Sequence, residues 1–250
     1  METVPDFSHC PHIPPPRSVR MVVLPPSTCS YLPGRASQSR ALLAASIPPD
    51  VYHDFMDAGF RRSGRMLYQP ICVGCRECRA IRVPVDTFGP SKSQRRSMRR
   101  NADLIQTVGP PDLTPEKFDL YRRYVLQWHR HEHEPTMQEL EEFLFDSPIT
   151  PGGTIEICHR DPTGKLLGVG ICDLSVESLS SVYFFFDPDE AGRGIGTFSA
   201  LHEIEFARTL GVPHYYLGYY VAACETMAYK ANFEPYELLG MDGQWRRGTS

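Results

Sequence analysis

Two hydrophobic periodicities alternate along the last hundred residues of the chain. Short apolar runs between turn residues are typical of strands, while apolar residues spaced three or four apart are typical of a helix face. The predicted elements are strands at 154–160, 166–173 and 180–187, a helix at 196–210, a strand at 214–221, a helix at 225–231 and a strand at 235–239. This order predicts an α+β fold around one mixed sheet.

The first half of the chain has weaker and more mixed patterns. Seven prolines among residues 1–28 predict an extended, poorly ordered lead-in over residues 1–27. Beyond it we expect helices at 36–45 and 50–58, a strand at 80–85, a helix from 91, a linker at 109–112, and helices at 114–131 and 136–145. We therefore predict an N-terminal module over residues 28–108 and a second domain over residues 109–250.

Composition restricts the class of protein. The chain has 250 residues, of which 41% are hydrophobic and 22% charged, which excludes wholesale disorder, collagen and coiled coil. No apolar run approaches the roughly 18 residues of a membrane span, and no basic segment followed by an apolar one marks a secretory signal. We expect a cytoplasmic protein without a membrane partner.

Charge is distributed unevenly. The net charge is -4, yet residues 61–100 hold 11 basic and 2 acidic residues, a local charge of +9, whereas residues 101–250 hold 11 and 23, a charge of -12. On a helix, five basic residues of this segment form one stripe: Lys92, Arg95, Arg96, Arg99 and Arg100. Such a stripe favours contact with the phosphates of a nucleic acid over an ordinary solvated face, which usually mixes signs.

Three of the eight cysteines fall within seven residues, as Cys72, Cys75 and Cys78. Thiolates at this C-x2-C-x2-C spacing converge on a zinc ion or an iron–sulfur cluster, and Cys29 is the best candidate for a fourth ligand. The alternative is a set of reduced thiols without a metal. A metal here would stabilise a small, proline-rich module rather than take part in catalysis.

Two further motifs are weaker. Residues 192–197 (GRGIGT) lie between a predicted strand and a predicted helix, where backbone N–H groups suit an anion, but they match neither a Walker nor a Rossmann fingerprint. The histidines His129, His131 and His133 fit the H-x-x-E-H protease pattern. Because Pro135 ends the helix two residues later, a solvated helix end is the favoured interpretation.

The motifs taken in order resemble a known family. The chain is similar to the N-terminal part of bacterial aspartate/glutamate leucyltransferases at residues 29–33 (CSYLP), 68–70 (YQP), 82–85 (RVPV) and 94–96 (QRR). It is similar to their C-terminal part at residues 183–188 (YFFFDP), 196–197 (GT), 216–220 (YLGYY) and 227–230 (MAYK). These enzymes are grouped with the arginyl-tRNA–protein transferases. The resemblance implies transfer of leucine from Leu-tRNA to proteins with N-terminal Asp or Glu, marking them for degradation.

The resemblance also implies a GNAT-like acyltransferase domain with a small Cys-rich N-terminal module. In GNAT acetyltransferases the pyrophosphate loop begins with Arg or Gln; this chain has Ala191 there, which disfavours coenzyme A and suits a tRNA donor. Tyr229 matches the tyrosine that protonates the leaving group. No cofactor is required for transfer, and DNA is not an expected partner.

Further roles follow from the chemistry of an aminoacyl ester and an amine. Asp187 is the candidate base, and the candidate oxyanion donors are backbone N–H groups near Phe185 or a tyrosine hydroxyl such as that of Tyr219. The acidic side chain of the acceptor needs a cation, for which Arg82, Arg193 and Lys230 are candidates. The leucyl side chain needs an apolar pocket, for which the strand with Phe184–Phe186 and the tyrosine-rich strand with Tyr216 are available.

Three other functions remain open from sequence alone. The donor can be Arg-tRNA, or the chain can be an acetyl-CoA-dependent transferase. A non-enzymatic alternative is an RNA-binding module built on a zinc knuckle.

Overall fold

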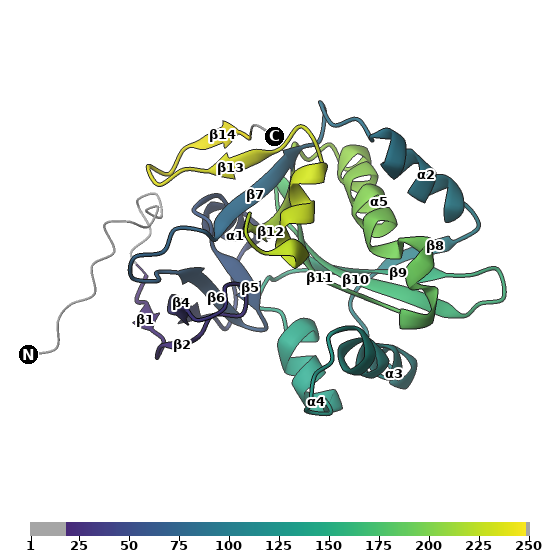
Figure 1. Ribbon diagram of the computed structural model, residues 1–250, viewed down its shortest axis with the longest axis horizontal. Helices are drawn as coiled ribbons and strands as arrows, with labels where there is room; N and C mark the ends of the chain where they lie inside the picture. Colours follow the sequence, from purple (N-terminus) through teal and green to yellow (C-terminus); the bar gives the residue numbers. More distant parts are fainter. Residues whose placement is uncertain (1–18, 249–250) are drawn as a thin grey trace, which may run out of the picture.

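An eight-stranded sheet runs through the part of the chain that the computed structural model describes, residues 19–248 (Figure 1). Its order is β14-β13-β7-β12-β11-β10-β9-β8, and only the β11–β12 pair is parallel. The strands are β7 (Arg79–Pro84), β8 (Ile105–Gly109), β9 (Thr154–Arg160), β10 (Leu166–Leu174), β11 (Ser178–Phe186), β12 (His214–Tyr220), β13 (Glu237–Leu239) and β14 (Trp245–Arg247). The α+β class predicted from the sequence is confirmed.

Helices cover both faces of this sheet (Figure 1). On one face lie α5 (Ile195–Thr209) and, beside it, α2 (Lys92–Arg100). On the other face lie α3 (Pro115–Arg123) and α4 (Met137–Leu140), each continued by a π-helical turn, Tyr124–Trp128 and Glu141–Phe145. A short helix α6 (Glu225–Ala228) continues as a 3-10 turn (Tyr229–Asn232). No helix among residues 19–248 has the length and apolarity that crossing a bilayer requires.

A second, four-stranded sheet belongs to the N-terminal residues. Its order is β1-β4-β6-β5, and it packs with helix α1 (Pro49–Asp57). The strands are β1 (Val22–Val23), β4 (Ser39–Leu43), β6 (Met66–Pro70) and β5 (Arg61–Ser63), beside a small pair of β2 (Ser27–Thr28) and β3 (Ala36–Ser37). The lead-in therefore ends earlier than predicted, because β1 already pairs with β4; residues 1–18 lie outside the described part of the chain.

The helix predicted at 36–45 is wrong. Residues 39–43 have good helix propensity, but they form β4, which pairs antiparallel with β6 along its whole length. Buried Arg40, the second residue of the strand, donates from Nε to the side-chain oxygen of buried Gln69 at 2.9 Å. Pairing within the sheet overrides the local preference for a helix.

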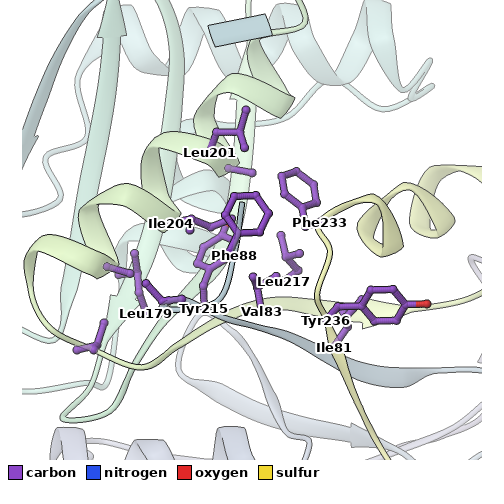
Figure 2. Packing of buried hydrophobic residues seen from close by; sticks show 14 of the residues in the cluster. Ile81, Val83, Phe88, Leu179, Leu201, Ile204, Tyr215, Leu217, Phe233 and Tyr236 are labelled. Atoms are coloured by element: carbon purple, nitrogen blue, oxygen red, sulfur yellow. The ribbon is translucent and has the colours of Figure 1, made fainter. Parts of the chain in front are cut away.

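The predicted domain boundary near residue 108 is also wrong as a structural division. Strand β7, from the N-terminal module, lies between β12 and β13 of the main sheet, and β8 forms its edge. The buried core below α5 shows the same mixing: Ile81 and Val83 of β7 pack with Ile204 of α5 and Leu217 of β12 (Figure 2). The N-terminal residues thus complete the sheet of the second domain instead of forming a separate unit.

At the centre of the sheet, two strands part. β11 and β12 pair only where Ser178–Ser180 faces His214–Tyr216. Beyond these residues the two strands no longer pair with each other, although each still pairs with its other neighbour. A bulge follows in β12 between Tyr216 and Gly218, and Gly218 adopts a left-handed φ of 87°. Beyond Ser180 and Tyr216 the facing edges of the two strands are therefore not hydrogen-bonded to each other.

Candidate active-site groove

A groove of about 1120 Å³ lies where α2, the start of α5 and the segment after α6 meet. Its lining includes Ser97, Arg100, Gly194, Thr197 and Tyr229. The groove therefore combines residues that the sequence analysis assigned to separate motifs: the basic helix, the glycine-rich loop and the candidate acid.

The start of α5 supplies a site for an anion. Residues 188–193 form a 3-10 turn, and Gly194 then takes a left-handed φ of 67° to begin the helix. The N–H groups in the first turn of this 15-residue helix have no intrahelical acceptor, and the helix dipole favours negative charge there. A phosphate group fits this environment better than a neutral ligand does.

Helix α2 holds the loop that precedes α5. Ser97 Oγ donates to the Gly194 carbonyl at 3.1 Å, and Arg100 donates to the Gly192 carbonyl at 2.6 Å. Asn101, which caps α2, donates to the Arg193 carbonyl at 3.0 Å. The basic helix is therefore hydrogen-bonded to the loop before α5 and forms part of the wall of the groove.

The predicted basic stripe is exposed along its length, but its members differ in surroundings. Arg96 and Arg100 line the groove, together with Arg193 and Arg247. Arg95 is instead hydrogen-bonded to the Pro90 carbonyl, while Lys92 and Arg99 lie outside the lining. Glu234 is the acidic residue of the lining, so the groove carries a net positive charge.

Tyr229 is the predicted catalytic residue that the structure places in the groove. It exposes 45% of its surface, and desolvation together with the nearby Glu203 carboxylate raises the pKa of its hydroxyl to about 12. The hydroxyl is therefore protonated at neutral pH and can donate a proton to a leaving oxygen.

Asp187 has an environment that disfavours the predicted role as base. Its carboxylate is buried and is paired with Arg123 at 2.7 Å and with Lys165 at 2.9 Å. Burial alone would raise the pKa of Asp187, but the hydrogen bonds from these two cations outweigh burial and leave the pKa below its ordinary value. It also accepts from the Asp189 N–H and so caps the 3-10 turn before α5.

Tyr219 and Tyr216 are buried and have their hydroxyls engaged. Tyr219 donates to the Gly59 carbonyl at 2.8 Å, and burial raises the pKa of Tyr219 well above its ordinary value. The Tyr216 hydroxyl lies 3.0 Å from the Asp57 carboxylate and 3.1 Å from the Arg82 guanidinium. These contacts tie β12 to the N-terminal sheet and α1, so the predicted roles of both tyrosines in the reaction conflict with their positions.

The three cations proposed for the acceptor carboxylate lie in different places and have different partners. Arg82 is neutralised by ion pairs at 2.7 Å with both Asp57 and Glu237. Arg193 reaches the groove but is paired with Asp103. Lys230 is buried beside β12, donating to the Tyr219 carbonyl at 2.8 Å, and it has no ion-pair partner among residues 19–248.

The four predicted metal ligands gather in one region of the N-terminal module. Burial, followed by charge repulsion from Cys72, Cys29 and Cys75, raises the pKa of Cys78 to about 12. Backbone N–H groups of Tyr31 and Leu32 point to Cys29 Sγ at 3.4 Å, as the N–H of Gln38 does to Cys72 Sγ.

Within the described residues, however, no three Cys, His, Asp or Glu side chains are arranged to share one metal ion. The metal therefore stays a prediction. The same finding covers the histidines of the H-x-x-E-H pattern, of which His133 is paired with Glu139 at 3.3 Å on the surface.

Some residues of the site were missed from the sequence. Gln94 is buried, caps α2 through a capping box with Ser91, and donates to the Asn232 carbonyl at 3.0 Å, which joins α2 to the segment after α6. The S-x-x-Q pattern was a usable signal for this role. No sequence pattern marks Arg247, which lines the groove, or Arg61, which is buried. The residues around each of them come together only in the folded chain.

The strand order, the parting of β11 and β12 and the groove at the start of α5 agree with the GNAT-like fold that the resemblance implies. The family models then identify the chain more closely, since the N-terminal model of the arginine-tRNA-protein transferases matches residues 27–96 and the C-terminal model matches residues 116–240. The chain belongs to the arginine-tRNA-protein transferase family.

Curated relatives match nearly the whole chain. An aspartate/glutamate leucyltransferase from Chromohalobacter salexigens is 40% identical over 238 residues, which covers 92% of this chain and 94% of the relative. One from Acinetobacter baumannii is 38% identical and one from Hahella chejuensis 35%, each over 229 residues and 90% of this chain, with 83% and 96% of the relatives covered.

Solved structures are more distant. The C-terminal domain of a putative lysylphosphatidylglycerol synthetase from Agrobacterium fabrum is 16% identical, with a TM-score of 0.49 over 83% of this chain and 65% of that chain.

Proposed function

We propose that this enzyme transfers leucine from Leu-tRNA to the N-terminal Asp or Glu of proteins. The observation that carries the proposal is the basic groove, whose lining brings together arginines of α2, the start of α5 and Tyr229. The names of the curated relatives support both the amino acid and the acceptor residues.

The groove suits the 3′ end of a tRNA as the donor. Arg96, Arg100 and Arg247 can contact successive phosphates, and the first turn of α5 can bind one phosphate through its N–H groups. Ala191 stands where a coenzyme A-dependent enzyme has a basic or amide side chain, so the loop offers less to a pyrophosphate. The terminal ribose would then lie beside Tyr229, with the aminoacyl ester directed towards the parted strands β11 and β12.

In the reaction, the α-amine of the acceptor attacks the ester carbonyl of leucyl-tRNA. A C–N bond forms, the bond between the carbonyl carbon and the ribose oxygen breaks, and the nitrogen loses one proton while the ribose oxygen gains one. Tyr229 supplies the proton to the ribose oxygen. An α-amine has a pKa of about 7.7–8.0, so part of it is already neutral at pH 7 and a strong base is unnecessary.

Positioning accounts for most of the rate in this mechanism. Aminolysis of an ester is energetically downhill, and holding amine and ester together can lower the barrier by several kcal/mol, within the range of about 7–11 kcal/mol known for well-oriented reactants. Backbone N–H groups of β11 beyond Ser180, where this strand no longer pairs with β12, are candidate donors to the oxyanion. The product is a protein with an added N-terminal leucine, and we propose that this tags it for degradation in the cytoplasm.

The test is a transfer assay with purified protein. Radiolabelled Leu-tRNA, Arg-tRNA and acetyl-CoA are each supplied with a peptide that begins with Asp, and the peptide is analysed by mass spectrometry. A mass increase of one leucyl residue, only with Leu-tRNA, supports the proposal.

Other outcomes point to the alternatives. Extension by arginine identifies an arginyl transferase, and acetylation identifies an acetyl-CoA-dependent enzyme. RNA binding without any change in the peptide, unaffected by the variant Tyr229→Phe, indicates a binding module.

A further inference from the structure

Two buried cations near the parted strands lack a carboxylate partner in the described part of the chain. Arg61 of β5 exposes 5% of its surface and Lys230, in the turn after α6, exposes 8%. Two other buried cations have carboxylate partners: Arg62 pairs with Asp173 and Lys117 pairs with Glu156. A buried charge without a counter-ion is costly, so a protein retains one where a ligand or the reaction uses it.

Both cations contact the same short stretch of β12. Arg61 Nη2 donates to the Gly218 carbonyl at 3.1 Å, while Lys230 Nζ donates to the next carbonyl, that of Tyr219, at 2.8 Å. A Cβ atom built on Gly218 would lie 3.4 Å from Lys230 Nζ. This stretch follows the bulge, where β12 no longer pairs with β11.

Arg61 has one hydrogen-bond donor that the described residues do not use. Its guanidinium lies 5.4 Å from the ring centroids of both Tyr216 and Tyr219, and its other contacts are backbone carbonyls and the sulfur of Met56. The buried Nε atom of Arg61 has no hydrogen-bond partner in the part of the chain that the structure describes. A buried donor without an acceptor is rare in folded proteins and is a second sign of an absent ligand.

We infer that Arg61 and Lys230 form the subsite that recognises the acidic side chain of the acceptor, so that an N-terminal Asp or Glu binds with its carboxylate beside Gly218. The inference rests on the proposed function and deepens it, because it assigns the residues that select the acceptor. Tyr229 lines the groove and is the neighbour of Lys230, so donor and acceptor sites would meet at the parted strands.

The other candidates fit this role less well. Arg82 already balances two carboxylates, and Arg193 is paired with Asp103. An incoming carboxylate would have to compete with these residues, whereas at Arg61 and Lys230 it completes the charge balance. In a buried, poorly hydrated site, such a charge pair discriminates strongly against the neutral amides Asn and Gln.

The charge state of Lys230 makes the selection depend on pH. Burial, and then repulsion by Arg61, lowers the pKa of Lys230 to about 7, while Cys224 and Cys78 oppose this shift. Below pH 7 Lys230 is protonated and attracts a carboxylate; above pH 7 it becomes neutral and the attraction weakens. The preference for Asp over Asn should therefore fall as the pH rises.

The experiment compares two peptides that differ only in the first residue, Asp or Asn. The ratio of their kcat/KM values for leucyl transfer is measured from pH 6 to pH 8.5, which cancels the titration of the α-amine common to both. The wild-type ratio should fall about tenfold over this range. In Lys230→Met the ratio should be at least tenfold lower at pH 6 and independent of pH, and Arg61→Met should also lower it.

Controls separate this inference from the proposed function. Arg122→Met removes an exposed cation that pairs with Asp119 and Glu134 on the surface, and it should leave the ratio unchanged. If a variant fails to fold by circular dichroism, the wild-type pH profile still tests the inference.

The outcomes are distinct. Transfer with an Asp/Asn ratio that neither pH nor Lys230→Met alters overturns the inference while the proposed function stands. If no peptide is extended, the proposed function fails, and fluorescence anisotropy of the labelled peptides tests the subsite: tighter binding of the Asp peptide, lost in Lys230→Met, supports it, and equal binding overturns it.

Discussion

The Nε atom of Arg62 lies 2.7 Å from a carboxylate oxygen of Asp173, and neither side chain has any exposed surface. The hydroxyls of Tyr52 and Thr154 donate to the same carboxylate, each at 2.7 Å. Arg62 and Tyr52 come from the N-terminal module, whereas Asp173 and Thr154 belong to the main sheet. This buried network therefore fastens the two sheets to each other and fixes the position of β5, which carries Arg61.

Removing the carboxylate should destabilise the whole protein. We expect Asp173→Ala to lower the free energy of unfolding by about 3–5 kcal/mol, because it leaves the buried guanidinium of Arg62 without a counter-charge. Urea denaturation followed by circular dichroism measures the change. The exposed pair of Asp242 and Arg246 provides the control, and Asp242→Ala should not shift the midpoint measurably. Equal midpoints for wild type and Asp173→Ala would show that the network does not hold the sheets together.

The C-terminal elements were predictable because each one carries its own local signal. The apolar face of α5, the turn between β9 and β10, and the aromatic run of β11 determine their structure without distant partners. The capped start of α2 is of the same kind, with Ser91 and Gln94 forming the box.

What the sequence could not predict depends on distant partners. Strand β4 has helical composition but pairs with β6, and β7 enters the sheet of the other domain between β12 and β13. The candidate site shows the same division. Tyr229 could be found from its motif, whereas the ion pairs that occupy Asp187 and Arg82 come from elements far away in the chain.

Tyr229→Phe tests the proton donor. This variant keeps the ring in the groove and removes only the hydroxyl, so we expect kcat for leucyl transfer to fall by about 10²-fold or more, the usual contribution of a general acid, with little change in KM for Leu-tRNA. Because the pKa of Tyr229 is about 12, the wild-type rate should not decline between pH 7 and pH 9 through loss of this proton.

A matched tyrosine provides the control. Tyr220 packs against Tyr236 with ring centroids 6.5 Å apart and does not line the groove, so Tyr220→Phe should keep kcat within about twofold. Single-turnover kinetics with preloaded leucyl-tRNA measures both variants. If Tyr229→Phe transfers leucine as fast as wild type, another group protonates the ribose oxygen.

Arg96→Gln tests whether the groove binds phosphates. Arg96 lines the groove, and within residues 19–248 it makes no hydrogen bond or ion pair that would couple it to the fold. Loss of one phosphate contact should weaken tRNA binding and reduce the slope of log K against log salt concentration by about 0.7–0.9. Filter binding at several salt concentrations measures the slope. Arg122→Gln, on the opposite face of the sheet, should leave the slope unchanged, and an unchanged slope for Arg96→Gln would remove α2 from the tRNA interface.

The last prediction concerns the metal content of the cysteine cluster. Without a cation, the thiol of Cys78 is protonated, since its pKa is about 12; a bound zinc ion or iron–sulfur cluster would convert it to a thiolate and release a proton. N–H groups directed at Cys29 and Cys72 suit thiolates, so we expect protein purified without oxygen to hold zinc or iron. Elemental analysis and the absorption spectrum distinguish the two.

Cys78→Ser should abolish this metal content and lower the Tm, because a bound metal would link the segment around Cys29 to the loop that leads into β7. Cys158 is buried beside Glu156 in the main sheet, away from the cluster, so Cys158→Ser should retain the metal. Metal-free wild-type protein whose Tm equals that of Cys78→Ser would mean that the four cysteines are ordinary reduced thiols. In that case strand pairing and buried contacts such as the Arg62–Asp173 pair attach the N-terminal module without a metal.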